Sequence, residues 1–190
     1  MTERPGGREA LLAAARAELD ERGHAGISLR AVARRAGVSH AAPKYHFPDR
    51  AALLTAIATQ GFTELTAALH EVARHAPGDP LAVLGRAYID FGLAHPALID
   101  LMFRPSELHT DDQHLQQAQH DAIGALSAAV QPVPGIDTDA LTLISWALAH
   151  GLTVLTRDGA LQSAADLGTP EDAAATARTL VALFATHLRP

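Results

Sequence analysis

Helical periodicity, which runs almost from end to end, constrains this 190-residue chain most. Apolar residues recur every three to four positions, and no run of alternating Val, Ile, Thr and aromatic residues is typical of a strand. We therefore predict an all-α fold. The expected helices, about nine in all, cover roughly 7–22, 29–36, 39–46, 49–74, 80–94, 96–103, 111–131, 137–157 and 171–188.

The first three expected helices have recognisable ends. Gly23 and Gly37 suit left-handed positions that close a helix. Ser28 and Ser39 are expected to cap the N-termini of the second and third helices, because a serine oxygen accepts from a free backbone N–H there. Pro43 then falls about four residues after the cap, where a proline is still tolerated. A short helix, a glycine turn and a second short helix predict a helix-turn-helix.

Charge separates this N-terminal head from the rest of the chain. Residues 1–50 carry nine Lys or Arg and six Asp or Glu, a net charge of +3, whereas residues 51–190 carry six and fifteen, a net charge of −9. Phosphate repels an acidic body, so DNA contacts are expected only in the head. We predict a DNA-binding domain over 1–50 and, joined to it by the long helix, a helical ligand-binding and dimerisation domain over 51–190.

The residues of the third helix fit entry into a major groove. Small Ala41 and Ala42 let the backbone approach base edges. Lys44, Tyr45 and His46 offer donors for phosphate. The alternative is that Tyr45, His46 and Phe47 form a small core cluster. We assign Phe47 to the core, expect Lys44 and Tyr45 to face DNA, and leave His46 open.

The stretch RGHAGISLRAVARRAGVSHAAPKYHFPDRAALL resembles the N-terminal domain of the tetracycline-repressor (TetR) family, over residues 8–60. The resemblance implies a three-helix head in which Ser28 and Ser39 contact phosphates. It also implies that His40, Ala41 and Tyr45 face the groove and that Arg50 contacts the DNA backbone. The expected DNA-binding residues are Ser28, Arg30, Ser39, His40, Ala41, Lys44, Tyr45, His46 and Arg50.

The chain departs from the family pattern at one pair of positions. Pro43-Lys44 stands where the family usually has Leu-Tyr. The phosphate contact expected of that tyrosine is therefore either replaced by Lys44 or shifted to Tyr45.

In this family the C-terminal helices bind a small molecule and form the dimer. Trp146-x-x-x-His150-Gly151 resembles the Trp-His-Gly signature of one subgroup, and the segment 91–103 resembles a helix bend beside the pocket. Spacing of four places Trp146 and His150 on one helix face, although core packing is the alternative for both. The expected pocket residues are Phe91, His95, Leu98, Met102, Phe103, His120, Trp146 and His150.

The last two long helices are expected to form a four-helix dimer interface because they carry broad apolar faces. The residues assigned to it are Leu141, Ile144, Leu148, Leu180, Val181 and Phe184. The sequence has no secretory signal and no uninterrupted apolar stretch of about 20 residues. We therefore expect a cytoplasmic protein that does not associate with a membrane.

Catalytic and metal chemistry find little support in the residues. The chain has no cysteine, no G-x-S-x-G and no phosphate loop. Its eleven histidines include no pair at the spacing of three or four that places two ligands on one helix. We expect no enzyme activity, no cofactor and no metal site.

The sequence thus predicts a DNA-binding transcriptional regulator, a homodimeric repressor that a small hydrophobic effector releases from a palindromic operator. The first alternative is a small-molecule-binding module or enzyme with a vestigial DNA-binding head. The second is a non-specific architectural DNA protein.

Overall fold

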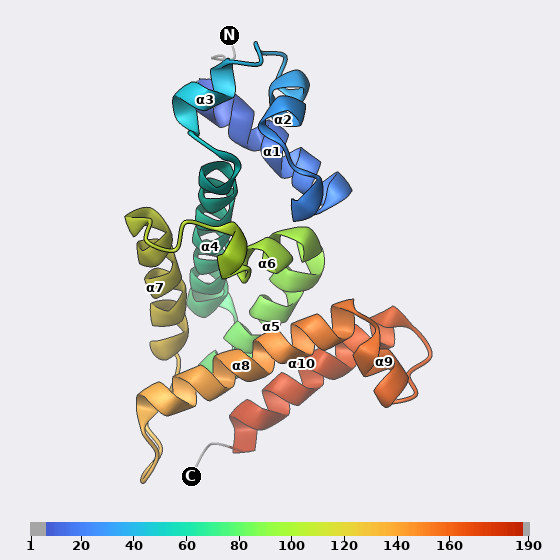
Figure 1. Cartoon of the computed structure of the whole chain (residues 1–190). Coiled ribbons are helices and arrows are strands. Elements are labelled where there is room, and N and C mark those ends of the chain that lie inside the picture. The colour runs from blue at the N-terminus through green and yellow to red at the C-terminus, as the bar shows by residue number, and fades with distance from the viewer. Residues whose placement is uncertain (1–6, 188–190) are drawn as a thin grey trace. The chain divides into compact units, whose positions relative to one another are not determined.

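The computed structural model describes residues 7–187, which form ten α-helices, two 3-10 helices and no strand. The all-α prediction is confirmed. The helices divide into two compact units (Figure 1). The head unit holds the described chain up to Phe62 together with His95–Gln119, and the body unit holds Thr63–Ala94 and the described chain from His120 onward. These compact units are not the functional domains predicted from the sequence, and the division into a DNA-binding domain over 1–50 and a second domain over 51–190 stays a prediction.

The head unit consists of α1 (Gly7–Arg22), η1 (His24–Gly26), α2 (Leu29–Arg35), α3 (Ala42–His46), α6 (Pro96–Met102), η2 (Pro105–Glu107), the first half of α4 (Arg50–His75) and the first turns of α7 (Gln113–Ser127). Its core is formed by large aliphatic side chains from α1, α2, α4 and α6. They include Leu11, Leu19, Val32, Leu53, Leu54, Ile57, Leu98 and Leu101.

The helices α4 and α6 pack closely within the head unit because Gly61 has no side chain. A Cβ atom there would lie 2.7 Å from Met102 Sδ and 2.9 Å from a methyl group of Leu98. Phe62 meets Phe103 edge to face, with ring centroids 5.5 Å apart. The segment that follows α5 in the sequence is thereby built into the core of the head.

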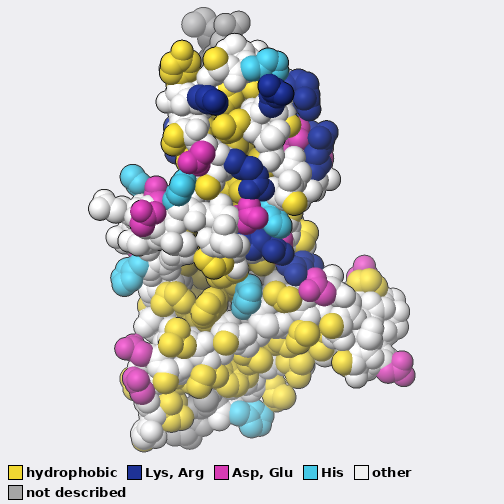
Figure 2. Space-filling model, viewed as in Figure 1, with side chains coloured by type: hydrophobic (Ala, Val, Ile, Leu, Met, Phe, Trp, Pro, Cys, Tyr) yellow, Lys and Arg dark blue, Asp and Glu magenta, His cyan; other side chains and the backbone are white. Residues whose placement is uncertain are grey.

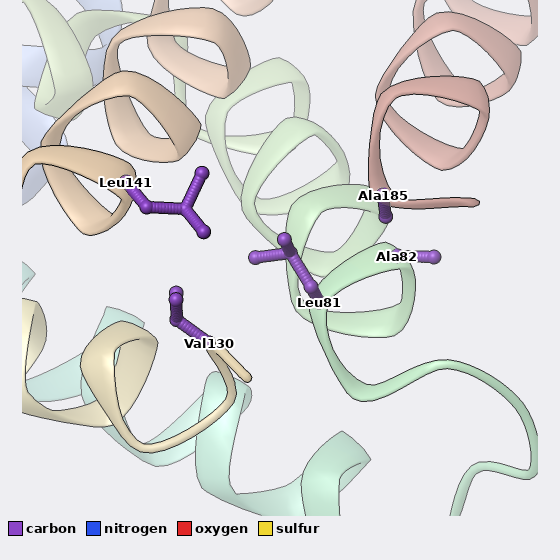
Figure 3. Close-up of a cluster of buried hydrophobic side chains, with 5 residues drawn as sticks. All are labelled: Leu81, Ala82, Val130, Leu141 and Ala185. Carbon is purple, nitrogen blue, oxygen red and sulfur yellow. The ribbon is translucent and has the colours of Figure 1, made fainter. Parts of the chain in front are cut away.

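The body unit consists of the remainder of α4 and α7 with α5 (Pro80–Ala94), α8 (Thr138–Arg157), α9 (Ala160–Ala164) and α10 (Pro170–His187). The helix α5 packs against both α8 and α10. Figure 3 shows one cluster of this core, in which side chains from α5, α8, α10 and the turn after α7 meet. Its residues are Leu81, Ala82, Val130, Leu141 and Ala185.

Several expected helix ends need correction. The helix predicted over 111–131 covers only Gln113–Ser127. It begins at Gln113 because Asp112 caps it by accepting from the Leu115 amide at 3.0 Å. The short helix α9 and both 3-10 helices were not predicted. Gly159, with φ +73°, introduces α9 directly after α8, and periodicity cannot identify a helix of five residues.

The apolar surface of α8 and α10 is broader than the core requires. Leu143, Ile144 and Leu155 on α8 and Leu180 and Leu183 on α10 are exposed, and Figure 2 shows hydrophobic side chains gathered over these two helices. The helix α8 is also the one described helix that is long and apolar enough to cross a membrane by length and composition. Its buried face carries hydroxyl groups and packs against α5 and α10, as in the core helix of a folded unit.

Candidate DNA-binding surface and effector site

The helix α2 begins as predicted. Ser28 has extended backbone angles, and its Oγ accepts from the Ala31 amide at 3.2 Å. Val32 and Ala33 are fully buried, whereas Arg30 and Arg34 are exposed. The sequence LRAVARR therefore forms one apolar face toward α1 and one basic face toward solvent.

The turn after α2 is a glycine-dependent Schellman motif. Gly37 has φ +67°, the Val38 amide donates to Ala33 O at 3.0 Å, and the Gly37 amide donates to Arg34 O at 3.2 Å. These two bonds satisfy carbonyl groups at the end of α2. They also set the direction in which the chain enters α3.

The prediction that Ser39 caps the third helix is wrong. The N-cap of α3 is Ala41, without a side-chain bond, and Ser39 contributes only its carbonyl oxygen, which accepts from Ala42 at 3.0 Å. Pro43 consequently lies at the second helical position rather than four residues after the cap. A first-turn amide has no intrahelical partner, so proline costs no hydrogen bond there.

The surface around α3 is strongly exposed. Tyr45 keeps 86% of its surface, which excludes it from a core cluster. Ser39, His40, Ala41, Lys44 and His46 are also exposed. Phe47 is buried, as predicted, and the Arg8 guanidinium lies over its ring at 5.4 Å. Figure 2 shows Lys and Arg side chains gathered on the helices of the head.

An ion cluster fixes α2 against α1. Arg35 Nε donates to Glu18 Oε1 at 2.7 Å, and the other guanidinium nitrogens bind Glu21. Hydrogen bonding to Arg35 lowers the pKa of the Glu21 carboxyl. Sequence reasoning left Glu18 out because a buried glutamate has no signature in the helical pattern. Arg35, the last residue of the basic helix α2, is therefore bound within the fold.

The Arg50 guanidinium is bound within the head unit. Its Nε donates to Ile27 O at 3.0 Å and its Nη2 donates to His24 O at 2.7 Å. Its Nη1 donates to Glu107 Oε2 at 2.5 Å. The hydrogen bond from Arg50 holds the pKa of Glu107 below its ordinary value. The contact of Arg50 with the DNA backbone stays a prediction.

The predicted effector residues fall in both units. His95, Leu98, Met102 and Phe103 belong to the head unit, where Leu98 and Met102 are buried against α4. Phe91, His120, Trp146 and His150 belong to the body unit, where Phe91 is buried and His120 is exposed. The role of these eight residues in effector binding stays a prediction.

Tyr88, which sequence reasoning missed, joins Trp146 and His150 within the body unit. Its hydroxyl lies 2.9 Å from His150 Nδ1 and is hydrogen-bonded to the Trp146 side chain. Because an indole only donates, the Tyr88 oxygen accepts from Trp146, and the direction of its bond to His150 follows the tautomer of the imidazole.

Burial keeps this group uncharged. It raises the pKa of Tyr88 and lowers the pKa of His150, to which the nearby Arg157 also contributes. The rings of Trp146 and His150 lie 6.1 Å apart, and the rings of Tyr88 and His150 lie 6.2 Å apart. The three aromatic side chains are thus in contact and joined to one another by hydrogen bonds through the Tyr88 hydroxyl.

A hollow of about 690 Å³ lies within the head unit. It is lined by Arg8, His46, Phe47, Pro48, Ala52, Thr55, Ala56, Thr59, Gln60, His109, Asp111, Asp112 and His114. His109 Nε2 lies 3.1 Å from Asp49, and the His109 amide donates to Thr55 Oγ1 at 2.9 Å. Over residues 7–187, no three His, Asp or Glu side chains are grouped to hold a metal ion.

Family models match both parts of the chain. Residues 11–57 match the model described as bacterial regulatory proteins, tetR family, and residues 81–184 match the tetracyclin repressor-like C-terminal domain. The second match alone covers more than half of the chain. The chain therefore belongs to the TetR family of transcriptional regulators, with a helix-turn-helix DNA-binding domain and a C-terminal domain of the ligand-binding type. No curated protein sequence matches it significantly.

Solved structures agree with this assignment. A protein of unknown function from Rhodococcus sp. RHA1 is 33% identical, with a TM-score of 0.79 over 94% of this chain and 95% of that one. A TetR-family transcriptional regulator from Pectobacterium atrosepticum is 21% identical, with a TM-score of 0.70 over 93% and 91%. The regulator FadR from Bacillus subtilis, solved with stearoyl-CoA, is 11% identical, with a TM-score of 0.67 over 92% and 97%. The last two share the fold.

Proposed function

We propose that this TetR-family chain is a homodimeric cytoplasmic repressor that binds a palindromic operator and is released by a small hydrophobic effector. The observation that carries the DNA-binding part is the exposed surface of α2 and α3, with Tyr45 projecting from it. An aromatic hydroxyl held in solvent beside Lys44 is suited to a phosphate or a base edge. The proposed contacts are Ser28, Arg30, Ser39, His40, Ala41, Lys44, Tyr45 and His46.

Salt titration tests this proposal. The chain should bind DNA flanking its own gene at least 10³-fold more tightly than random DNA at physiological salt. Lys44→Ala should weaken binding to both DNAs equally. It should also reduce the slope of log K against log salt by about 1, the amount expected for one phosphate contact. A ratio near one would indicate an architectural protein, and an absence of affinity would indicate a binding module with a vestigial head.

Dimerisation is proposed through α8 and α10. Their exposed leucines and isoleucine form an apolar surface that a second copy would cover, giving a four-helix interface. Leu141 and Val181, which were assigned to this interface from the sequence, are instead buried in the body core. Leu143, Leu155 and Leu183, which are exposed on the same two helices, replace them in the proposal beside Ile144 and Leu180.

Light scattering tests the dimer. Leu183→Glu places a charge in the middle of the proposed interface and should give a monomer at micromolar concentration, because an unpaired buried charge is costly. Ile136→Glu, at a similarly exposed isoleucine in the loop before α8, is the matched control and should stay dimeric. A wild-type monomer would contradict the proposal.

The effector is proposed to contact Trp146, His150 and Tyr88, the group to which the Trp-x-x-x-His-Gly subgroup signature contributes. The roles of the remaining predicted pocket residues, which fall in both units, stay sequence-based predictions. The FadR likeness, with its bound stearoyl-CoA, supports an effector with an extended apolar portion. The ring nitrogen of His150 that does not face Tyr88 would exchange a hydrogen bond with a polar group of that molecule.

Tryptophan fluorescence tests the effector site. Trp146 is the only tryptophan, so its emission should change with every compound that releases DNA. Tyr88→Phe removes the hydroxyl that orders Trp146 and His150 and should weaken effector binding while leaving DNA affinity unchanged. A compound that releases DNA without changing the emission would place the effector elsewhere.

A further inference from the structure

We propose that Arg50 is a positioning residue, which Glu107 holds against the turn before α2, and not a phosphate contact. The inference concerns how the head presents α2 to DNA, and it therefore rests on the proposed DNA binding. It replaces the role that the family resemblance implies for Arg50.

The Arg50 guanidinium donates hydrogen bonds to three acceptors. Nε and Nη2 donate to Ile27 O and His24 O, and Nη1 donates to Glu107. A planar fork of fixed donors can bind two carbonyl groups and a carboxylate at once, whereas a lysine ammonium is a single point charge. The geometry therefore uses the property that distinguishes Arg from Lys.

The two carbonyl groups belong to the turn that starts α2. His24 opens η1, and Ile27 directly precedes the capping Ser28 and is almost fully buried. Fixing Ile27 O fixes the backbone from which α2 departs. An error of about 1 Å in the start of the helix would be carried to every side chain that it presents to DNA.

The neighbouring contacts show that Glu107 does not act alone. In the same segment, the His109 amide donates to Thr55 Oγ1, and His109 Nε2 lies beside Asp49, which caps α4. His24 Nδ1 lies 3.7 Å from Asp100. The segment 100–109 is thus bound to the start of α4 and to η1, and Glu107 is the carboxylate that reaches Arg50.

Electrostatics also disfavours a phosphate contact. The Glu107 carboxylate neutralises the Arg50 guanidinium at 2.5 Å, so the pair attracts phosphate weakly. To bind DNA directly, Arg50 would have to exchange a charged partner and two carbonyl groups for one phosphate. This exchange gives little net gain.

Three variants and one control separate the two roles in DNA binding. Arg50→Ala, Arg50→Lys and Glu107→Ala should each weaken operator binding about 10-fold, the size of one hydrogen bond to a charged group. The slope of log K against log salt should stay the same. Asp111→Ala removes an exposed acid two residues after this segment and should leave binding unchanged or slightly stronger.

A phosphate contact of Arg50 predicts different results for the same variants. If Arg50 contacts phosphate, Arg50→Lys should keep most of the affinity, and Arg50→Ala should reduce the salt slope by about 0.9. Glu107→Ala should then bind DNA more tightly, because an acid has been removed. Either result overturns the positioning role.

Hydrogen exchange tests the inference independently of DNA. Arg50→Lys should speed amide exchange across residues 24–35 and leave exchange in α10 unchanged. Equal exchange in the two proteins would overturn the inference even if the chain binds no operator. If instead exchange rises but the wild type shows no specific DNA binding, only the proposed function fails.

Discussion

Removing Arg35 should destabilise the head although the residue lies on the basic helix. The Glu18 side chain is 3% exposed and accepts from Arg35, which is itself 29% exposed. The second carboxylate oxygen of Glu18, Oε2, is buried and has no hydrogen bond in the described structure, although Arg22 Nε lies 3.3 Å away. Arg35→Ala would therefore leave a buried carboxylate with one exposed partner.

The magnitude follows from that geometry. Breaking a fully buried ion pair costs about 3–5 kcal/mol. Because Arg35 keeps part of its surface in water and Arg22 remains close, we expect about 2 kcal/mol. The exposed contact with Glu21 adds little, because solvent screens both charges. For a chain of this size the melting temperature should fall by roughly 4–8 °C.

Urea unfolding followed by circular dichroism measures this loss. Arg34→Ala, one residue earlier and exposed, is the matched control and should change stability by less than about 0.5 kcal/mol. The double variant Glu18→Met with Arg35→Met should recover most of the loss, because an apolar pair leaves no buried charge. Equal stability of Arg35→Ala and Arg34→Ala would refute the reasoning.

Three further predictions concern the two units and pH. Gly85→Ala should destabilise the body by about 1–2 kcal/mol in urea unfolding, because the new Cβ would lie 2.5 Å from Val181 Cγ2, and Val181→Ala should relieve the clash. Gly37→Ala should cost about 1 kcal/mol through its positive φ alone, since nothing lies within 4 Å of the added atom. The Glu107 pKa lies below its ordinary 4.5, so its bond to Arg50 contributes stability above about pH 4.5 that is lost as pH falls through the lowered value. Unfolding of wild type and Glu107→Ala should therefore converge in acid, and a constant difference down to pH 2 would contradict this.

Local signals predicted most of the helices. Gly23, Ser28 and Gly37 mark helix ends through backbone preferences that act within a few residues, and the structure places all three where the sequence does. The prediction for Ser39 was wrong because the Schellman turn extends the chain beyond Ser39 before α3 begins. Two serines in similar contexts thus have different roles, and only the geometry of the turn distinguishes them.

Long-range contacts could not be predicted in this way. Glu107 reaches Arg50 across 57 positions, and Tyr88 reaches His150 across 62. Nothing in the periodicity of either segment indicates its partner. The candidate residues Trp146 and His150 share a helix face and could be paired from spacing, whereas Tyr88 belongs to another helix.

Footprinting on the DNA beside the gene tests the central claim most directly. A dimeric repressor should protect two half-sites whose centres lie about 34 to 36 Å apart along the helix. Tyr45→Ala should abolish the protection at a concentration where the wild type saturates it, while circular dichroism confirms that the variant is folded. Protection that is uniform along the fragment, or that survives Tyr45→Ala unchanged, would contradict the account.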